Sequence, residues 1–177
     1  MIRRFPILLA ALVLIAAAAQ AQTFVRLSTD EGDILLEMNV EKAPGHVANF
    51  MHLGGNGFYT DTTFHRVMSD FMIQGGDPLS KNANRSDDGT GGPAWSDVLP
   101  AEDLAKLEAV RAMLDERGYA GLPAQAGVKA EFNDTSHLRG VLSMARSQSP
   151  DPGGRPFFIC VADAPHLHRQ YTAFGRA

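Results

Sequence analysis

Apolar and polar positions alternate in two short stretches near the start of the chain, residues 24–29 and 34–38. Such alternation is typical of strands that bury one face and expose the other. Between them lies Asp-Glu-Gly-Asp at 30–33, and a glycine flanked by acidic residues between two strand-like runs indicates a tight turn. We therefore predict a β-hairpin over residues 24–38.

A helix is predicted next, beginning at Pro44 and ending at Gly54 and Gly55. Proline suits the first helical turn, where its missing N–H has no partner to lose, and glycine often follows the last turn. The residues expected on the apolar face of this helix are Val47, Phe50, Met51 and Leu53.

The rest of the chain alternates between short strands and loops. A stretch rich in Gly, Asp, Asn and Ser at 75–92 predicts a loop. Five further strands are predicted, at residues 63–67, 71–74, 141–145, 157–162 and 171–175. Many short strands with only one or two helices favour a mainly β domain, a sandwich or a barrel.

Residues 101–117 differ from their surroundings, because Leu104, Leu107, Val110 and Leu114 recur at helical spacing among charged residues. We predict an amphipathic surface helix here. Packing against the domain explains the apolar stripe better than docking of a partner, since the stripe is narrow.

The first residues indicate a secretory signal peptide. Arg3 and Arg4 precede an unbroken apolar run at 7–19, and Ala19-Gln20-Ala21 forms a small-x-small cleavage site. A membrane anchor is the alternative, but spanning a bilayer takes about 20 apolar residues. We therefore expect cleavage after Ala21 and export of the mature chain. The expected destination is the periplasm, and secretion into the medium is the alternative.

Length, charge and residue content limit the kinds of partner and ligand that the protein is expected to bind. The chain of 177 residues suits one domain, and its net charge is −4. It has no basic stretch that would hold nucleic acid or anionic lipid. The single cysteine, Cys160, lies in an apolar run and is expected to be buried. His166 and His168 have no third ligand nearby in the sequence, which argues against a zinc site.

Several motifs carry more specific information than this pattern. They are Phe-His-Arg-Val at 64–67, Phe-Met-Ile-Gln-Gly-Gly-Asp at 71–77, Gly-Val-Leu-Ser-Met-Ala-Arg at 140–146, Phe-Phe-Ile at 157–159, and Tyr-Thr-Ala-Phe-Gly-Arg at 171–176. In these motifs and their order, the sequence resembles the cyclophilin family of peptidyl-prolyl cis–trans isomerases. The resemblance runs from about Phe24 to the last residue, with an interruption at about 96–127.

The resemblance implies a closed antiparallel eight-stranded β-barrel with capping helices. It also implies that the last strand and helix of the family pattern are missing from this chain. The expected organisation is a signal peptide at 1–21 and one isomerase domain at 22–177, with a helical insertion at about 96–127.

The resemblance further implies rotation of X–Pro peptide bonds, which assists the folding of exported proteins. Arg66 would be the cation beside the prolyl nitrogen, and Gln74 would bond the substrate backbone. The residues expected to bind substrate are Phe71, Met72, Ala145, Arg146, Phe158, His166, Leu167 and Tyr171. The expected partners are proline-containing polypeptides, with no cofactor, metal, nucleic acid or membrane, and the expected state is a monomer.

The sequence departs from the family at two groove positions. Pro156 stands where the family usually has glutamine, so a side-chain amide near the groove is lost and we expect reduced activity. His166 stands where many eukaryotic members carry tryptophan, which predicts weak inhibition by cyclosporin. Tyr171 resembles the bacterial variant of its position.

Two alternatives to the enzyme remain open at this level. The same groove could bind proline-containing peptides with negligible turnover, for which Pro156 and the short C-terminus are the arguments. A chaperone or docking role through the helix at 101–117 is the weaker option.

Overall fold

The computed structural model describes residues 22–93, 101, 105, 128–146 and 156–177. The predicted signal peptide at 1–21 lies outside the described residues, as does the insertion at 96–127 apart from residues 101 and 105. The strands are β1 (Thr23–Thr29), β2 (Gly32–Met38), β3 (Arg66–Met68), β4 (Met72–Gly75), β5 (Val141–Met144), β6 (Phe157–Cys160) and β7 (Ala173–Arg176). The strands are accompanied by the helix α1 (Pro44–Gly55) and by the short 3₁₀ helices η1 (Pro78–Lys81) and η2 (Pro165–Leu167).

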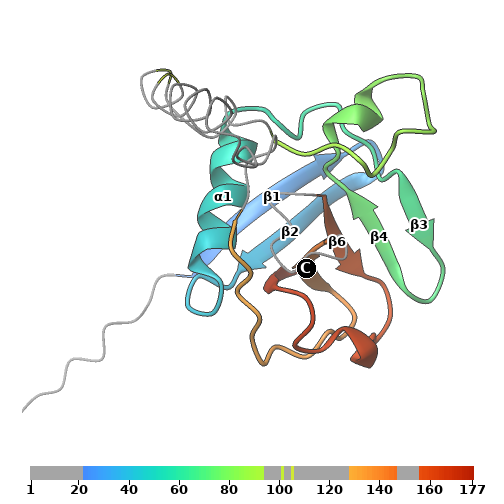
Figure 1. The fold of residues 1–177 in the computed structure, drawn as a ribbon. Helices are drawn as coiled ribbons and strands as arrows, with labels where there is room; N and C mark the ends of the chain where they lie inside the picture. Colours follow the sequence, from blue (N-terminus) through green and yellow to red (C-terminus); the bar gives the residue numbers. More distant parts are fainter. Residues whose placement is uncertain (1–21, 94–100, 102–104, 106–127, 147–155) are drawn as a thin grey trace, which may run out of the picture.

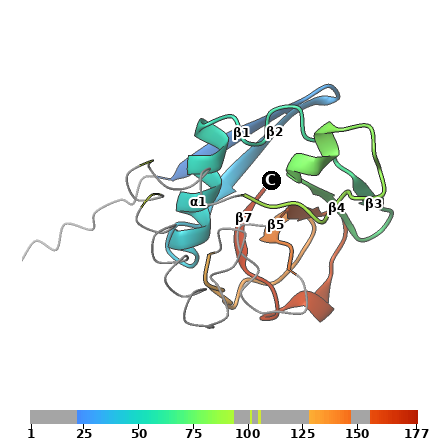
Figure 2. The same ribbon diagram turned by 45° about the horizontal axis from the view of Figure 1, so that its top comes forward.

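All seven described strands belong to one antiparallel sheet in the order β1-β2-β7-β5-β6-β4-β3. The sheet curls into a half-barrel, and α1 lies along one side of it (Figures 1 and 2). The predicted mainly β architecture is therefore confirmed. The resemblance implied eight strands in a closed barrel, whereas in the described part of the chain β1 and β3 end the sheet without pairing to each other.

The first hairpin forms as the alternation predicts. β1 and β2 pair from Thr23 with Met38 to Thr29 with Gly32. Gly32 has φ of +121°, a conformation that residues with a Cβ rarely adopt, so the glycine of the turn is required by its backbone.

The main core lies between α1 and the concave sheet. Phe50 of α1 contacts the rings of Phe157 and Phe174, with centroids 5.3 and 5.4 Å apart. The predicted apolar face of α1 is partly wrong, because Met51 is 44% exposed while His46 is completely buried. His46 was left out of the predicted face because histidine counts as polar in such a pattern.

The buried His46 belongs to an unusual start of α1. Ala43 at the N-cap has no side chain that could accept a hydrogen bond. Instead, the carboxylate of Glu131 accepts hydrogen bonds from the backbone N–H groups of Gly45 and His46, at 3.0 and 2.9 Å. Glu131 also lies 2.7 Å from Nδ1 of His46. A distant carboxylate thus stabilises the first turn in place of a local cap.

Local hydrogen bonds move some element boundaries away from the predicted ones. The predicted strand at 63–67 begins only at Arg66, because the N–H of Thr63 donates to Oγ of Ser80 rather than to a strand. Within the predicted loop at 75–92, residues 78–81 form η1, whose first turn is capped by Asp77. The spacing of apolar residues predicts neither the Thr63–Ser80 hydrogen bond nor the cap formed by Asp77.

Candidate active site

One small cavity brings together nine of the ten predicted site residues. Its volume is about 80 Å³. Its lining consists of Arg66, Phe71, Met72, Gln74, Ala145, Arg146, Phe158, Leu167 and Tyr171. These residues come from segments far apart in the sequence, so the fold alone places them around one space.

The strand register explains how the polar and aromatic members meet. Arg66 on β3 pairs with Gln74 on β4, and Gln74 pairs with Phe158 on β6. Directly paired residues of an antiparallel sheet project to the same face. The three side chains therefore form a row across three strands, with the guanidinium on the edge strand.

The cavity has an apolar floor. Met72, Phe158 and Leu167 are 2%, 4% and 6% exposed, and the partly buried Phe71 and Tyr171 pack against them. This cluster is separate from the core under α1, because alternate residues of β6 point to opposite faces. Phe157 and Ile159 thus serve the main core, while Phe158 serves the cavity.

His166 is the predicted residue that does not line the cavity. It is exposed in η2, and its ring lies 5.3 Å from that of Phe71. It therefore borders the cavity behind Phe71 rather than facing into it.

Arg146 and Tyr171 form the side of the cavity opposite β3. The guanidinium carbon of Arg146 lies 4.8 Å from the centroid of the Tyr171 ring, in a cation–π arrangement. Nε of Arg146 donates to the backbone carbonyl of Gln170 at 2.9 Å. The two interactions hold the cation at this place.

Two histidines support the site without lining it. Nε2 of His65 lies 3.3 Å from the side-chain nitrogen of Gln74. His137 is fully buried and stacks on Phe158, with centroids 6.3 Å apart, and its Nε2 lies 3.0 Å from Oγ of Ser143. Burial chiefly, with the nearby His168 and His166, lowers the pKa of His137 to about 4.

Sequence patterns alone did not identify His137 as part of the site. The only available signal for His137 was its place a few residues before a strand, which does not predict a buried ring beneath an aromatic wall. Its role follows from the tertiary packing.

Pro156 takes part in the sheet through its carbonyl, which accepts a hydrogen bond from the N–H of Ala145 at 2.9 Å. It is fully buried at the start of β6. A proline at a strand start forgoes only its own N–H, which explains why the sheet tolerates it.

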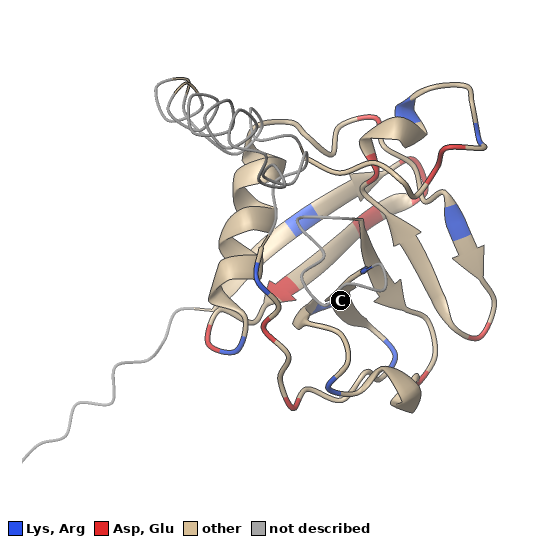
Figure 3. Ribbon diagram, viewed as in Figure 1, with Lys and Arg blue, Asp and Glu red and all other residues tan. Residues whose placement is uncertain are grey.

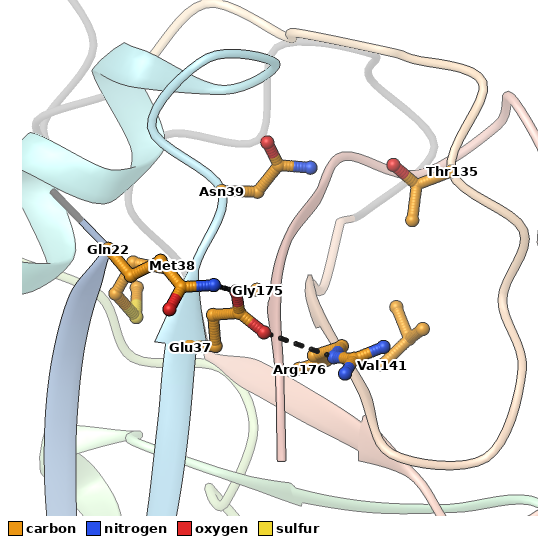
Figure 4. Close-up of a pocket in the computed structure, with 8 residues that line it drawn as sticks. All are labelled: Gln22, Glu37, Met38, Asn39, Thr135, Val141, Gly175 and Arg176. Carbon is orange, nitrogen blue, oxygen red and sulfur yellow. Dashed lines mark hydrogen bonds and ion pairs between the residues drawn. The ribbon is translucent and has the colours of Figure 1, made fainter. Parts of the chain in front are cut away.

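A second, larger cavity of about 470 Å³ lies near Gly175 (Figure 4). Glu37 and Arg176 line it and form an ion pair of 3.2 Å with each other. None of the described residues that line it is aromatic, and Glu37 and Arg176 neutralise each other's charge. The smaller cavity is therefore the better candidate, because it combines an apolar floor with cations at its rim.

Other sites find little support in the described part of the chain. No three His, Cys, Asp or Glu side chains gather there as metal ligands would, and no helix there has the length and apolar character to cross a membrane. Figure 3 shows acidic and basic positions spread over strands and loops. Cys160 is buried as predicted, and burial, aided by the charge of Asp163, raises the pKa of its thiol to about 11.

Comparisons with known proteins agree with this site. Residues 24–177 match the family described as cyclophilin type peptidyl-prolyl cis-trans isomerase/CLD. A probable peptidyl-prolyl cis-trans isomerase of Brucella suis is 34% identical over 161 residues, which cover 91% of this chain and 69% of that relative. A peptidyl-prolyl cis-trans isomerase of Synechococcus elongatus is 35% identical, over 85% of this chain and 77% of its own length.

Among solved structures, a cyclophilin-type isomerase of Cryptosporidium parvum, crystallised with the dipeptide Ala-Pro, superposes with a TM-score of 0.63. The identity is 28%, and the match covers 87% of this chain and 77% of that structure. The chain thus belongs to the cyclophilin family, and it is a peptidyl-prolyl cis–trans isomerase acting on proline-containing peptides. The alternative of a binding module or chaperone is not favoured, since the relatives are named as isomerases.

Proposed function

We propose that Arg66 is the catalytic residue of this isomerase and that the cavity beside it holds the substrate's proline ring. The observation that carries the proposal is the row of Arg66, Gln74 and Phe158 across three paired strands, above an apolar floor. A proline ring is apolar on its carbons, whereas its nitrogen lies at the bond to be rotated. A site for it needs this combination of apolar surface and adjacent donor.

Arg66 acts by favouring the twisted state of the peptide bond. Rotation must overcome a barrier of about 18–20 kcal/mol, which comes from the partial double-bond character of the C–N bond. In the twisted state the nitrogen lone pair is no longer delocalised, so it becomes a better hydrogen-bond acceptor. A guanidinium N–H beside that nitrogen then bonds the twisted state more strongly than either planar state, which is the condition for catalysis.

The size of this contribution follows from hydrogen-bond energies. A hydrogen bond involving a charged group contributes about 1.5–3 kcal/mol. Since about 1.4 kcal/mol corresponds to tenfold in rate, Arg66 accounts for roughly one to two orders of magnitude.

Gln74 and the end of β5 position the substrate backbone. The side-chain amide of Gln74 is oriented by His65 and lies beside Arg66. The N–H of Ala145 already donates to Pro156. We therefore assign the carbonyl of Ala145, an acceptor, as the group that bonds substrate there, next to Arg146.

Two variants separate catalysis from binding. Arg66→Lys keeps a positive charge but loses the planar fork, so we expect kcat to fall about tenfold or more with KM little changed. Phe71→Leu trims the cavity wall, so we expect a higher KM with a smaller effect on kcat. If Arg66→Lys changed only KM, the proposed role of Arg66 would be wrong.

We further propose that the protein is exported to the periplasm, where it assists folding of exported proteins as a monomer. The support is the arrangement of Arg3, Arg4, the apolar run at 7–19 and the site at Ala21. Cell fractionation and mass spectrometry should find a periplasmic protein that begins at Gln22, while deletion of residues 2–21 retains it in the cytoplasm. Cytoplasmic location of the full chain would contradict export, and light scattering that shows a dimer would contradict the monomer.

A further inference from the structure

The apolar floor of the substrate cavity continues beyond the residues that line it. Met72 belongs to this floor, and it pairs with Cys160 of β6 on one side and with Met68 of β3 on the other. Directly paired residues project to the same face of an antiparallel sheet, so these three side chains form a second row beside the one that begins at Arg66. Cys160 and Met72 are 1% and 2% exposed, whereas Met68 is 39% exposed. Apolar surface therefore extends from the buried floor onto the exposed edge of the sheet.

The turn between β3 and β4 fixes Met68 at the rim of the cavity. The N–H of Phe71, which lines the cavity, donates to the backbone carbonyl of Met68 at 3.2 Å. Asp70, which lies between them, has φ of +56°, the left-handed conformation found in tight turns. Met68 thus lies on the strand that carries Arg66, two residues further along it and on the same face.

This position differs from that of an ordinary exposed apolar residue. β3 ends the described sheet, and edge strands usually carry charged or polar side chains that prevent apolar contacts. The neighbouring Val67 is also exposed, at 67%, but it projects to the opposite face of β3. Only Met68 of these two continues the floor of a ligand cavity. Its flexible thioether side chain can adapt to apolar partners of several shapes.

We propose that Met68 is a specificity residue that favours substrates with a large apolar side chain close to the proline. Along β3, Met68 lies about 6.4–6.8 Å beyond Arg66. An extended peptide advances about 3.3–3.6 Å per residue, so the side chain that meets Met68 belongs to a residue one or two positions from the proline. This inference rests on the proposed placement of the proline ring beside Arg66.

The test uses proline peptides in which one position carries Leu or Ser, scanned over two positions on each side of the proline. We expect kcat/KM for the best Leu peptide to exceed that of its Ser counterpart about fivefold. The difference should lie mainly in KM, because an apolar contact away from the rotating bond stabilises the planar and twisted states alike. Equal kcat/KM for Leu and Ser peptides at every scanned position would overturn the inference.

Variants of β3 assign the preference to one side chain. Met68→Thr should reduce the preference to less than about twofold, whereas Met68→Leu should retain it. Val67→Thr is the matched control, because it removes an exposed apolar side chain from the same strand but from the face away from the cavity. Circular dichroism should show that each variant is folded. A preference that survives Met68→Thr, or that Val67→Thr lowers to the same extent, would contradict the role of Met68.

Arg66→Lys separates this inference from the proposed function. The same Leu and Ser peptides, labelled with a fluorophore, give dissociation constants by anisotropy for this variant and for the wild type. An unchanged kcat of Arg66→Lys, together with a Leu preference that depends on Met68, would count against the catalytic assignment alone. A lowered kcat of Arg66→Lys, without any Leu preference in the wild type, would count against Met68 alone.

Discussion

Replacing Glu131 by glutamine should destabilise the fold through the start of α1. In the wild type, one carboxylate accepts hydrogen bonds from the N–H groups of Gly45 and His46 and contacts the ring of His46. Glutamine keeps the size but has only one accepting oxygen, so its NH₂ group faces a donor. Hydrogen bonds to charged groups contribute about 1.5–3 kcal/mol, and a negative charge at a helix N-terminus about 0.3–1 kcal/mol. We expect Glu131→Gln to lower the free energy of unfolding by about 2 kcal/mol.

The pKa of Glu131 determines how the effect of this substitution on the free energy of unfolding depends on pH. Burial tends to raise the pKa of Glu131, but the hydrogen bonds from the His46 ring and the two backbone N–H groups outweigh it and lower the pKa below its ordinary value of 4.5. A lowered carboxylate pKa stabilises the fold above about pH 4.5, and this contribution is lost as the pH falls through the folded-state value. The difference between wild type and Glu131→Gln should therefore close below that pH.

The protonation state of His46 is consistent with this arrangement. Burial lowers its pKa against the opposing effect of Glu131, so the ring is neutral at pH 7. Its Nδ1–H then donates to the carboxylate, while the buried Nε2 finds no partner among the described residues and remains unprotonated.

Urea denaturation followed by circular dichroism at pH 7 and at pH 3–4 measures the effect. A loss of 2 kcal/mol corresponds to about 4–8 °C in Tm for a protein of this size. The control is Glu41→Gln, which removes the same charge from an exposed position just before α1 and should cost less than about 0.5 kcal/mol. If Glu131→Gln unfolded at the same urea concentration as this control, the capping role would be refuted.

Three further predictions concern the cavity and its support. Pro156→Gln restores a side-chain amide near the groove, so kcat/KM should rise about two- to tenfold, and an unchanged value would show that the amide is irrelevant. Cyclosporin should inhibit the wild type weakly and His166→Trp more strongly; submicromolar inhibition of the wild type would contradict this. Because the pKa of buried His137 is lowered to about 4, its protonation opposes folding, so stability should fall by up to about 3 kcal/mol between pH 6.5 and 4. His137→Gln should remove this share of the loss in urea titrations, and an identical pH profile would assign the loss to other groups.

The sequence predicts the strands well where alternation and turns act together. The β1–β2 hairpin follows from its period and from Gly32, and the short strands after it follow from apolar runs between loops. The boundaries of β3 and β7 could not be predicted, because they depend on hydrogen bonds between distant segments. Thr63 bonds Ser80, and Thr172 accepts bonds through its carbonyl from Ser143 and Met144 before β7 begins.

Site residues could be proposed from motifs, but their arrangement could not. Phe158 is distant in sequence from Arg66 and Gln74, and only the register of three strands places the three in one row. The residues that support the helix start and the cavity are even harder to identify from the sequence. Glu131 lies 85 residues after His46, whose N–H group donates to it, and His137 is buried by residues that surround it only in the folded chain.

The most direct test of the central claim is the rate at which the protein isomerises a short X–Pro peptide, measured beside Arg66→Ala and the control Arg26→Ala. Circular dichroism should first show that all three are folded. We predict that the wild type and Arg26→Ala accelerate isomerisation equally and that Arg66→Ala loses about one to two orders of magnitude in kcat/KM. Equal rates for wild type and Arg66→Ala would contradict the proposed mechanism, and a folded wild type without any acceleration would contradict the assignment of activity to this chain.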